Sequence, residues 1–355
     1  MADSKAIALY NALLKEINSG KYQPLGAFPS EFALAKRFHV ARGTVRSAKK
    51  MLEKTGLLCA RRGSGTNVTG CAEPHHSIGV LVSGCRYTEI FRCIGTAICS
   101  WAKNNGLRVL YGDASCLDAA KSMPRAMEFA RQLVCAKVDG VVVQPLEFIP
   151  DAAEKNVRLM SLFDEAEIPA VLLDCGIVGP DGRSAYDRIG IDNYAAGYLV
   201  GRHLAECGAK CVLCCASPFS PESVRNRFAG VRAVLPSVHG LEAAPGDYVR
   251  LRRALREHPE TNAIVCQNDV YAVGVMASLR RMKKKVPDDV MVAGFDGLNL
   301  SRLCSPKLTT VSQPVDDIAA LALDRLQRRM AGSSLPPVDI NLRAPLVVQK
   351  STAAR

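Results

Sequence analysis

The strongest constraint on the fold is an alternation of short apolar runs with helical segments that begins near residue 78. Amphipathic helices are expected between several of the runs, for example over Phe91–Asn104 and Ala195–Glu206. Strands and helices in this order wind into parallel sheets with helices on both faces. Residues 78–350 are numerous enough for two such lobes, so the region predicts a two-lobed, doubly wound α/β domain. The expected strands are Ile78–Ser83, Arg108–Gly112, Gly140–Gln144, Ala170–Asp174, Cys211–Ala216, Ala263–Cys266 and Val290–Phe295.

Polar residues stand at the ends of several of these strands. Ser83 and Asp174 each close a strand, Asn268 and Asp269 follow another, and Asp296 closes the last. Because ligands bind at the carboxyl ends of strands in open α/β sheets, these side chains predict a polar cleft between the lobes. Each residue also has a simpler interpretation, since a strand-end Asp or Asn often only caps the next helix.

Three further residues join this candidate effector site. Arg227 offers a guanidinium fork that can bind several hydroxyl groups, and Tyr248 offers an aromatic face that can stack on a sugar. Phe91, at the start of the first expected helix of the body, is a second aromatic candidate. The candidate effector-binding residues are therefore Ser83, Phe91, Asp174, Arg227, Tyr248, Asn268 and Asp296.

The first seventy residues form a different pattern. Apolar residues recur at helical spacing over Lys5–Ile17, and a second helix is expected after Ser30, a suitable N-cap. A third helix is expected over Arg42–Lys54, followed by two short strands, Leu57–Arg62 and Thr66–Val68, around a glycine-rich turn. This order predicts an N-terminal winged helix-turn-helix.

The charge distribution indicates what this domain binds. The whole chain has 46 Lys and Arg against 34 Asp and Glu, a net charge of +12, and residues 1–70 hold twelve of these basic residues against four acidic ones. Such asymmetry favours a polyanion as the partner of the head. Arg42 and Arg46 share one face of the third helix with Thr44 nearby, where side chains can reach base edges or phosphates in a major groove. The candidate DNA-binding residues are Ser30, Arg42, Thr44, Arg46, Arg62, Gly63 and Ser64.

The detailed motifs of the head resemble a known family. Phe28-Pro29-Ser30-Glu31, Val40-x-Arg42-x-Thr44-Val45-Arg46 and Gly63-x-Gly65-Thr66-x-Val68 are similar to the GntR-type winged-helix domain over about residues 4–70. The resemblance implies contact with double-stranded operator DNA through Arg42, Thr44, Arg46 and the wing. Phe32 stands where this family commonly has a DNA-contacting Arg, and Ala41 stands where it has a Ser cap, so the operator sequence does not follow from the resemblance.

The body resembles a second family, on different motifs. Asp192-Asn193-x-x-Ala196-Gly197, Asn268-Asp269-x-x-Ala272-x-Gly274, Gly294-Phe295-Asp296 and Leu308-Thr309-Thr310 are similar to the effector domain of the lactose/galactose repressor family over roughly residues 77–350. This resemblance implies the fold of periplasmic binding proteins, a homodimer and a small effector between the lobes. It assigns the effector to Ser83, Asp174, Arg227, Asn268 and Asp296, with Tyr248 as the stacking aromatic.

Two groups of cysteines and histidines could suggest a metal site. Cys71, His75 and His76 lie in or beside a segment without periodicity, residues 71–77, which is interpreted as a linker because nothing completes a known ligand spacing. Cys211, Cys214 and Cys215 fall within an expected buried strand and are interpreted as core packing. The sequence therefore predicts no metal and no cofactor.

The remaining composition excludes other classes of function. The sequence has neither a Gly-x-x-x-x-Gly-Lys loop nor a Gly-x-Ser-x-Gly elbow, and its six His offer few acid–base candidates, so an enzyme is not expected. The start lacks the apolar core of a signal peptide and no apolar run has membrane length, which argues against a periplasmic receptor and predicts a cytoplasmic protein without a membrane partner.

These observations together predict a ligand-responsive transcriptional regulator, with a repressor of carbohydrate-use genes as the leading hypothesis. Its expected parts are a DNA-binding domain over residues 1–70, a linker over 71–77, and an effector-binding and dimerisation domain over 78–350. Two alternatives stay open, namely a purine or other metabolite as effector, and a DNA-binding protein without an effector. Whether the effector releases the protein from DNA or holds it there is also open.

Overall fold

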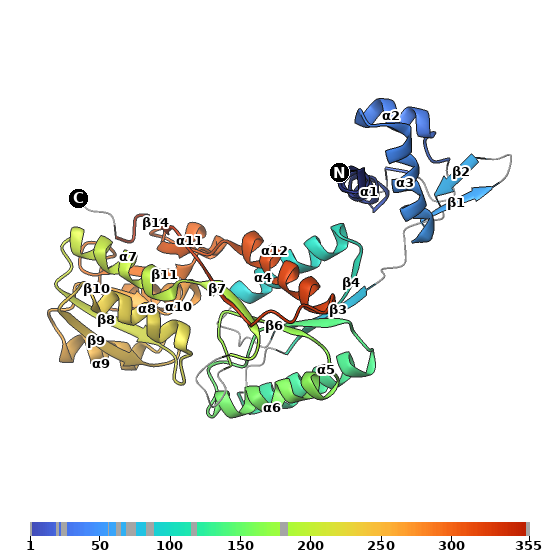
Figure 1. Cartoon of the computed structure of the whole chain (residues 1–355). Coiled ribbons are helices and arrows are strands. Elements are labelled where there is room, and N and C mark those ends of the chain that lie inside the picture. Colours follow the sequence, from blue (N-terminus) through green and yellow to red (C-terminus); the bar gives the residue numbers. More distant parts are fainter. Residues whose placement is uncertain are drawn as a thin grey trace. The chain divides into compact units, whose positions relative to one another are not determined.

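A computed structural model describes residues 2–18, 21–22, 27–55, 57–61, 65–68, 76–82, 89–114, 119–177 and 184–352 (Figure 1). The contacts between residues divide the chain into two compact units. One unit comprises Met1–Ile78 with Cys99–Val109, and the other comprises Gly79–Ile98 with Leu110–Arg355. No described helix is both long enough and apolar enough to cross a membrane.

The head has the elements expected of a winged helix-turn-helix. Its helices are α1 (Ala2–Asn18), α2 (Glu31–Phe38) and α3 (Arg42–Lys54), and its strands β1 (Leu58–Arg61) and β2 (Gly65–Val68) pair antiparallel. The three helices share a core in which Leu13, Leu34 and Leu52 are fully buried. The prediction from apolar spacing is therefore confirmed for this domain.

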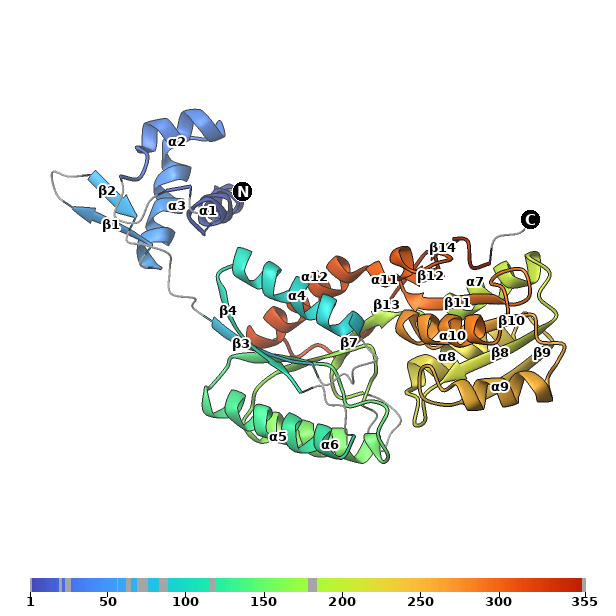
Figure 2. The same cartoon turned by 180° about the vertical axis from the view of Figure 1, so that it is seen from behind.

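The body contains two lobes, each built on one six-stranded sheet. In the first lobe, α5 and α6 cover one face of the sheet and α4 and α12 the other (Figures 1 and 2). In this sheet β13 pairs with β7, β7 with β6 and β6 with β5, all in parallel. The strand order is β13 (Asp339–Leu342), β7 (Asp187–Ile191), β6 (Ala170–Leu173), β5 (Gly140–Val143), β3 (His76–Val82) and β4 (Leu107–Asp113), and the helices are α4 (Glu89–Asn104), α5 (Ala119–Cys135), α6 (Ala152–Glu165) and α12 (Val315–Met330).

The second lobe repeats this architecture with one antiparallel edge strand. Its strands β8 and β11 are buried along their whole length, so Cys214 and Cys215 pack in the core as the sequence predicts. The strand order is β14 (Leu346–Val347), β12 (Thr309–Ser312), β11 (Met291–Asp296), β10 (Ala263–Cys266), β8 (Cys211–Ala216) and β9 (Ser237–Glu242), with β14 antiparallel to β12. The helices are α7 (Asn193–Glu206), α8 (Glu222–Arg232), α9 (Tyr248–Glu257), α10 (Asp269–Arg281) and α11 (Asn299–Leu303).

The chain passes between the lobes at three places within residues 184–352. It leaves the first lobe after β7 to enter α7, returns from β12 to α12, and crosses again between β13 and β14. Polar residues at the first two crossings, Asn193 and Gln313, therefore lie where the two lobes are covalently joined.

All seven strands expected in the body are present, with ends shifted by no more than two residues. Five strands of the body were not expected: β7, β9, β12, β13 and β14. Of these, β9, β13 and β14 lie at sheet edges, where half-exposed residues replace the apolar runs that identify a central strand.

Candidate functional site

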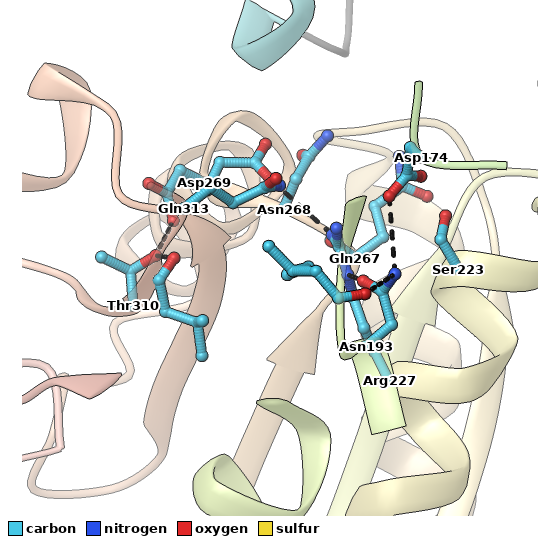
Figure 3. A network of polar contacts seen from close by, with 12 residues as sticks. Asp174, Asn193, Ser223, Arg227, Gln267, Asn268, Asp269, Thr310 and Gln313 are labelled. Carbon is cyan, nitrogen blue, oxygen red and sulfur yellow. Dashed lines mark hydrogen bonds and ion pairs between the residues drawn. The ribbon is translucent and has the colours of Figure 1, made fainter. Parts of the chain in front are cut away.

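The centre of the candidate effector site is Arg227 on α8, with a side chain that is 5% exposed. Its Nε donates to Asn193 Oδ1 at 2.8 Å and its Nη1 donates to the backbone oxygen of Gln267 at 2.7 Å. Arg227, Asn193 and Gln267 are drawn in Figure 3, and the same Nη1 of Arg227 lies 3.7 Å from Asp296 Oδ1. These partners come from α7, the end of β10 and the end of β11, so the guanidinium is fixed in one orientation.

Close helix packing brings Arg227 to this position. A Cβ added to Gly197 on α7 would lie 1.8 Å from the backbone oxygen of Arg227, and one added to Gly230 on α8 would lie 2.2 Å from the backbone oxygen of Tyr194. Only residues without a side chain allow the two helix backbones to approach this closely. Gly197, quoted in the sequence motifs, and Gly230 therefore serve to position the arginine.

Asp296 closes β11 and is 4% exposed. Its Oδ1 accepts a hydrogen bond from Gln313 Nε2 at 2.9 Å. Burial raises the pKa of Asp296 to about 7, although the charge of Arg227 and the hydrogen bond from Gln313 act in the opposite direction. This carboxyl group therefore titrates near neutral pH and can either donate or accept a hydrogen bond there.

The first lobe contributes a second acidic wall. Asp174 follows β6, and its Oδ1 accepts from Asn193 Nδ2 at 3.4 Å, which links this lobe to Arg227. The donor atoms of Glu147, Asp174 and Cys175 all lie within 4.8 Å of one another. Burial, helped by the charge of Asp174, raises the pKa of Glu147 to about 8. We call Asp174, Asn193, Arg227, Asp296 and Gln313 the Arg227 network.

Asn268 and Asp269 have structural roles in the second lobe. Asn268 caps α10, since its Oδ1 accepts from the backbone N–H of Tyr271 at 2.9 Å. Asp269 is fully buried and accepts from Thr310 Oγ1 at 2.6 Å and from the backbone N–H of Leu298 at 2.9 Å. Asn268 therefore caps a helix, the simpler of its two predicted roles, and its contact with an effector stays a prediction.

The remaining effector candidates lie in different places. Tyr248 begins α9, where its ring centroid lies 4.1 Å from the Arg281 guanidinium. Its contact with an effector stays a prediction. Phe91 is buried in the first turn of α4. Ser83 lies outside the described residues.

A cavity of about 830 Å³ opens beside the network. Its walls come from β6, β7, β13 and the starts of α7 and α8, and they include Asp174, Asn193 and Ser223. Among the described residues, Arg227, Asn268 and Asp296 do not line it, because they are covered by their own hydrogen-bond partners. The cavity therefore reaches the network from its Asp174 side.

Three polar residues of this region were not selected from the sequence. Glu147 stands four residues after β5, Gln313 directly follows β12, and Asn193 follows β7 by two residues. The rule of polar strand ends would have found Gln313 and Asn193 if β12 and β7 had been recognised as strands.

The candidate DNA-contacting helix is α3. Ser30 caps the preceding helix α2, with its Oγ accepting from the backbone N–H of Ala33 at 3.2 Å, as predicted. Val45, Ala48 and Leu52 bury one face of α3, so the opposite face, with Arg42 and Arg46, is exposed. Thr44 is half-buried. Arg62, Gly63 and Ser64 of the wing lie outside the described residues.

Arg46 already has an anionic partner in this structure. Its Nη2 lies 3.2 Å from Glu31 Oε2, and its hydrogen bonds lower the pKa of that carboxyl group. The Arg46 side chain is 63% exposed, so water screens this pair and it holds the arginine weakly. A phosphate or a guanine edge can therefore take the place of Glu31.

Comparison with known families assigns both parts of the chain. Residues 5–68 match the family described as bacterial regulatory proteins, gntR family. Residues 202–352 match the family described as periplasmic binding protein-like domain. These ranges contain α3 and most of the second lobe, including Arg227 and Asp296.

Individual proteins show the same similarity. The HTH-type transcriptional repressor PurR of Mannheimia succiniciproducens is 28% identical over 225 residues, which are 61% of this chain and 64% of that repressor, so the match spans just under two thirds of the relative. The transcriptional regulator CelR–cellobiose complex has a TM-score of 0.66 at 20% identity, over 91% of this chain and 100% of that one. A LacI family transcriptional regulator from Arthrobacter sp. FB24, in complex with lactose, has a TM-score of 0.64 at 22% identity, over 78% of this chain and 99% of that one.

Proposed function

We propose that this chain is a repressor whose operator affinity changes when a neutral sugar binds at the Arg227 network. It is a transcriptional regulator in which a gntR-family DNA-binding domain precedes a periplasmic binding protein-like domain. One observation carries this proposal. Side chains from both lobes and from two of the crossings between them join in a single polar network beside a cavity.

The chemistry of the network favours a neutral ligand rich in hydroxyl groups. Glu147, Asp174 and Asp296 offer carboxyl oxygens, against the single buried guanidinium of Arg227. Burial raises the pKa of Glu147 to about 8 and that of Asp296 to about 7, so the site disfavours negative charge, which a phosphorylated ligand would add. Sugar hydroxyls can donate to the carboxyl groups and accept from Arg227 and Asn193.

On the DNA side, we expect a homodimer. Two copies of α3 would then occupy two half-sites of a near-palindromic operator, with Arg42, Thr44 and Arg46 of each copy in the major groove. The fixed cations of the head supply the salt-sensitive part of the affinity. A repressor of this kind acts where the chromosome lies, so we expect the protein in the cytoplasm.

Coupling between the two sites follows from thermodynamics. The sugar changes operator affinity only to the extent that it binds two lobe arrangements differently, and the effect is reciprocal. Typical couplings are about 1–3 kcal/mol, or about 5- to 150-fold in affinity.

Known relatives guide the choice of ligands to test. CelR was solved with cellobiose and the Arthrobacter regulator with lactose, while the order of head and body in this chain is similar to that of the bacterial arabinose repressor. Purines form the second class of ligands to test, because the body resembles a family in which this cleft binds sugars in some members and purines in others. No response to either class would favour the third possibility, a DNA-binding protein without an effector.

The test combines DNA binding with ligand titration. Full-length protein is titrated onto a labelled duplex from the region upstream of its own gene, with and without arabinose, ribose, lactose, cellobiose, their phosphates, and purine bases. We expect one neutral sugar to shift the DNA affinity by at least fivefold. A shift by a sugar phosphate or a purine alone would refute the neutral-sugar assignment.

Two variants separate the sites. Arg46→Ala should weaken DNA binding and lower the salt slope by about 1 while leaving the heat of sugar binding unchanged. Arg253→Ala, which removes an exposed cation from α9, is the charge-matched control and should leave both unchanged. Arg227→Ala should abolish sugar binding and spare DNA binding. Asp174→Asn tests the same point with a less buried side chain.

A further inference from the structure

A second cluster of metal-binding side chains lies in the second lobe, at the amino-terminal ends of the strands. The Arg227 network lies at their carboxyl-terminal ends. Donor atoms of Cys211, His239 and Glu260 lie within 4.8 Å of one another, and His258 lies beside them, with its Nδ1 3.8 Å from Glu260 Oε1. Cys211 is the first residue of β8, whereas the candidate effector site lies beyond the last residues of the strands. The six extended residues of β8 separate its two ends by roughly 17–20 Å, so the cluster is independent of the effector site.

The fold brings these four residues together from three segments. His239 on β9 stands beside Leu213 in the parallel register, two residues along β8 from Cys211. His258 ends α9, and its ring stacks on that of His239 with a centroid distance of 3.6 Å. The next turn presents Glu260, and Asn262 fixes that turn, since its Oδ1 accepts from the backbone N–H of Cys211 at 3.3 Å.

The distances within the cluster identify its chemistry. Glu260 Oε1 lies 3.6 Å from Cys211 Sγ, 3.9 Å from His239 Nε2 and 3.8 Å from His258 Nδ1. Both His–Glu distances are too long for a hydrogen bond, which needs about 2.7–3.2 Å. A tetrahedral Zn²⁺ ion with bonds of about 2.0–2.3 Å requires about 3.3–3.8 Å between its ligand atoms, close to the three values observed.

We propose that Cys211, His239, His258 and Glu260 form a structural Zn²⁺ site that ties the start of β8 to β9 and to the end of α9. One thiolate and one carboxylate balance the charge of the ion, and two neutral imidazoles complete the set of S, N and O ligands that Zn²⁺ prefers. Four protein ligands fill a tetrahedral shell, which is typical of a structural rather than a catalytic zinc.

The site is open to solvent, and His258 must move to complete it, because of the four residues only Cys211, His239 and Glu260 have donor atoms that lie within 4.8 Å of one another. Cys211 is buried, but the side chains of His239, His258 and Glu260 are 35%, 31% and 55% exposed. Each imidazole binds a metal in its ring plane, so the two stacked rings, now 18° from parallel, would tilt apart on binding.

Cobalt is the probe for this site, because tetrahedral Co²⁺ with a thiolate ligand has intense d–d bands and a thiolate charge-transfer band, whereas octahedral aqueous Co²⁺ has only weak d–d bands. Full-length protein is stripped with a chelator, titrated with Co²⁺ and then with Zn²⁺. We expect one tetrahedral Co²⁺ per chain, displaced by Zn²⁺. Octahedral spectra only, or no binding, would overturn the proposal.

Variants test two of the four ligands, with an exposed cysteine as the control for adventitious binding. Cys211→Ser should remove the charge-transfer band, and Glu260→Gln, on an exposed turn that is safe for folding, should weaken Co²⁺ binding at least tenfold. Cys135→Ser on α5 should retain the full spectrum. Zn²⁺ should raise the melting temperature of the parent chain and not that of Glu260→Gln. Equal binding by the parent, Cys211→Ser and Glu260→Gln would refute the site.

Discussion

The protonation state of Asp296 offers the sharpest test of the Arg227 network. The carboxyl group is 4% exposed, and burial raises its pKa from 3.8 to about 7 even though the Arg227 guanidinium lies 3.7 Å away. Replacing it with the amide of the same shape, Asp296→Asn, removes the titration and keeps an oxygen that can accept from Gln313 Nε2.

The size and sign of the effect follow from linkage. A carboxyl group whose folded pKa is raised destabilises the folded state as pH rises from the unfolded pKa, and the full cost is reached above the folded pKa. A rise of about 3 units corresponds to about 4 kcal/mol at 1.36 kcal/mol per unit. Asp296→Asn should therefore be more stable than the parent chain by up to about 4 kcal/mol at pH 8, by less than half of this at pH 5, and equally stable near pH 3.

The assay is denaturant unfolding of both proteins at pH 5 and pH 8, followed by a signal from the body. The charge of Asp296 also raises the pKa values of Glu147 and Asp269, so its removal changes stability in the same direction through these groups. If the variant is less stable than the parent by the same amount at both pH values, the folded state holds an ionised Asp296 paired with Arg227, and the reasoning from burial is wrong. In either case the amide should weaken sugar binding.

Other predictions follow from local contacts. Ala41→Ser should add the missing cap of α3 and stabilise the head by about 1 kcal/mol, and Ser30→Ala should destabilise it by about as much at α2. Thermal melting measures both effects. No change in either variant would refute the capping argument. Glu31→Gln should free Arg46 and strengthen DNA binding about two- to fivefold, measured by the same duplex titration; weaker binding would show that Glu31 positions Arg46 for DNA. Asp187→Asn should cost about 3–5 kcal/mol in denaturant unfolding, because it leaves two arginines of α12 without their buried partner; a loss below 1 kcal/mol would contradict this.

The sequence predicted the parts of the fold that depend on local periodicity. The helices of the head and the central strands of both sheets have apolar spacings that few alternatives share, and Ser30 has the side chain that a cap requires. Edge strands such as β9 and β13 lack this signal, because half of their residues face solvent and need not be apolar.

The candidate sites were predictable only in part, for a related reason. Asp174, Arg227 and Asp296 were found as polar residues at expected strand or motif positions, but Asn193 and Gln313 follow strands that the sequence did not reveal. Tyr248 was assigned by analogy, and its ring lies against the Arg281 guanidinium in this structure. Cys211 was interpreted as core packing with its neighbours in β8, because a single strand gives no sign of the distant His239 and Glu260 that meet it in space.

The positions of Asn193 and Gln313 suggest how a ligand could select one lobe arrangement. Both residues lie at crossings between the lobes, and both bind the charged groups of the network, Arg227 in one case and Asp296 in the other. A sugar that replaces or extends these hydrogen bonds changes the partners of the segments about which the lobes would move. Its binding free energy must therefore differ between lobe arrangements, which is the condition that coupling to DNA requires. Asp174 on the opposite wall makes this difference in binding free energy larger. One ligand can contact both lobes only in an arrangement that keeps Asp174 near Asn193.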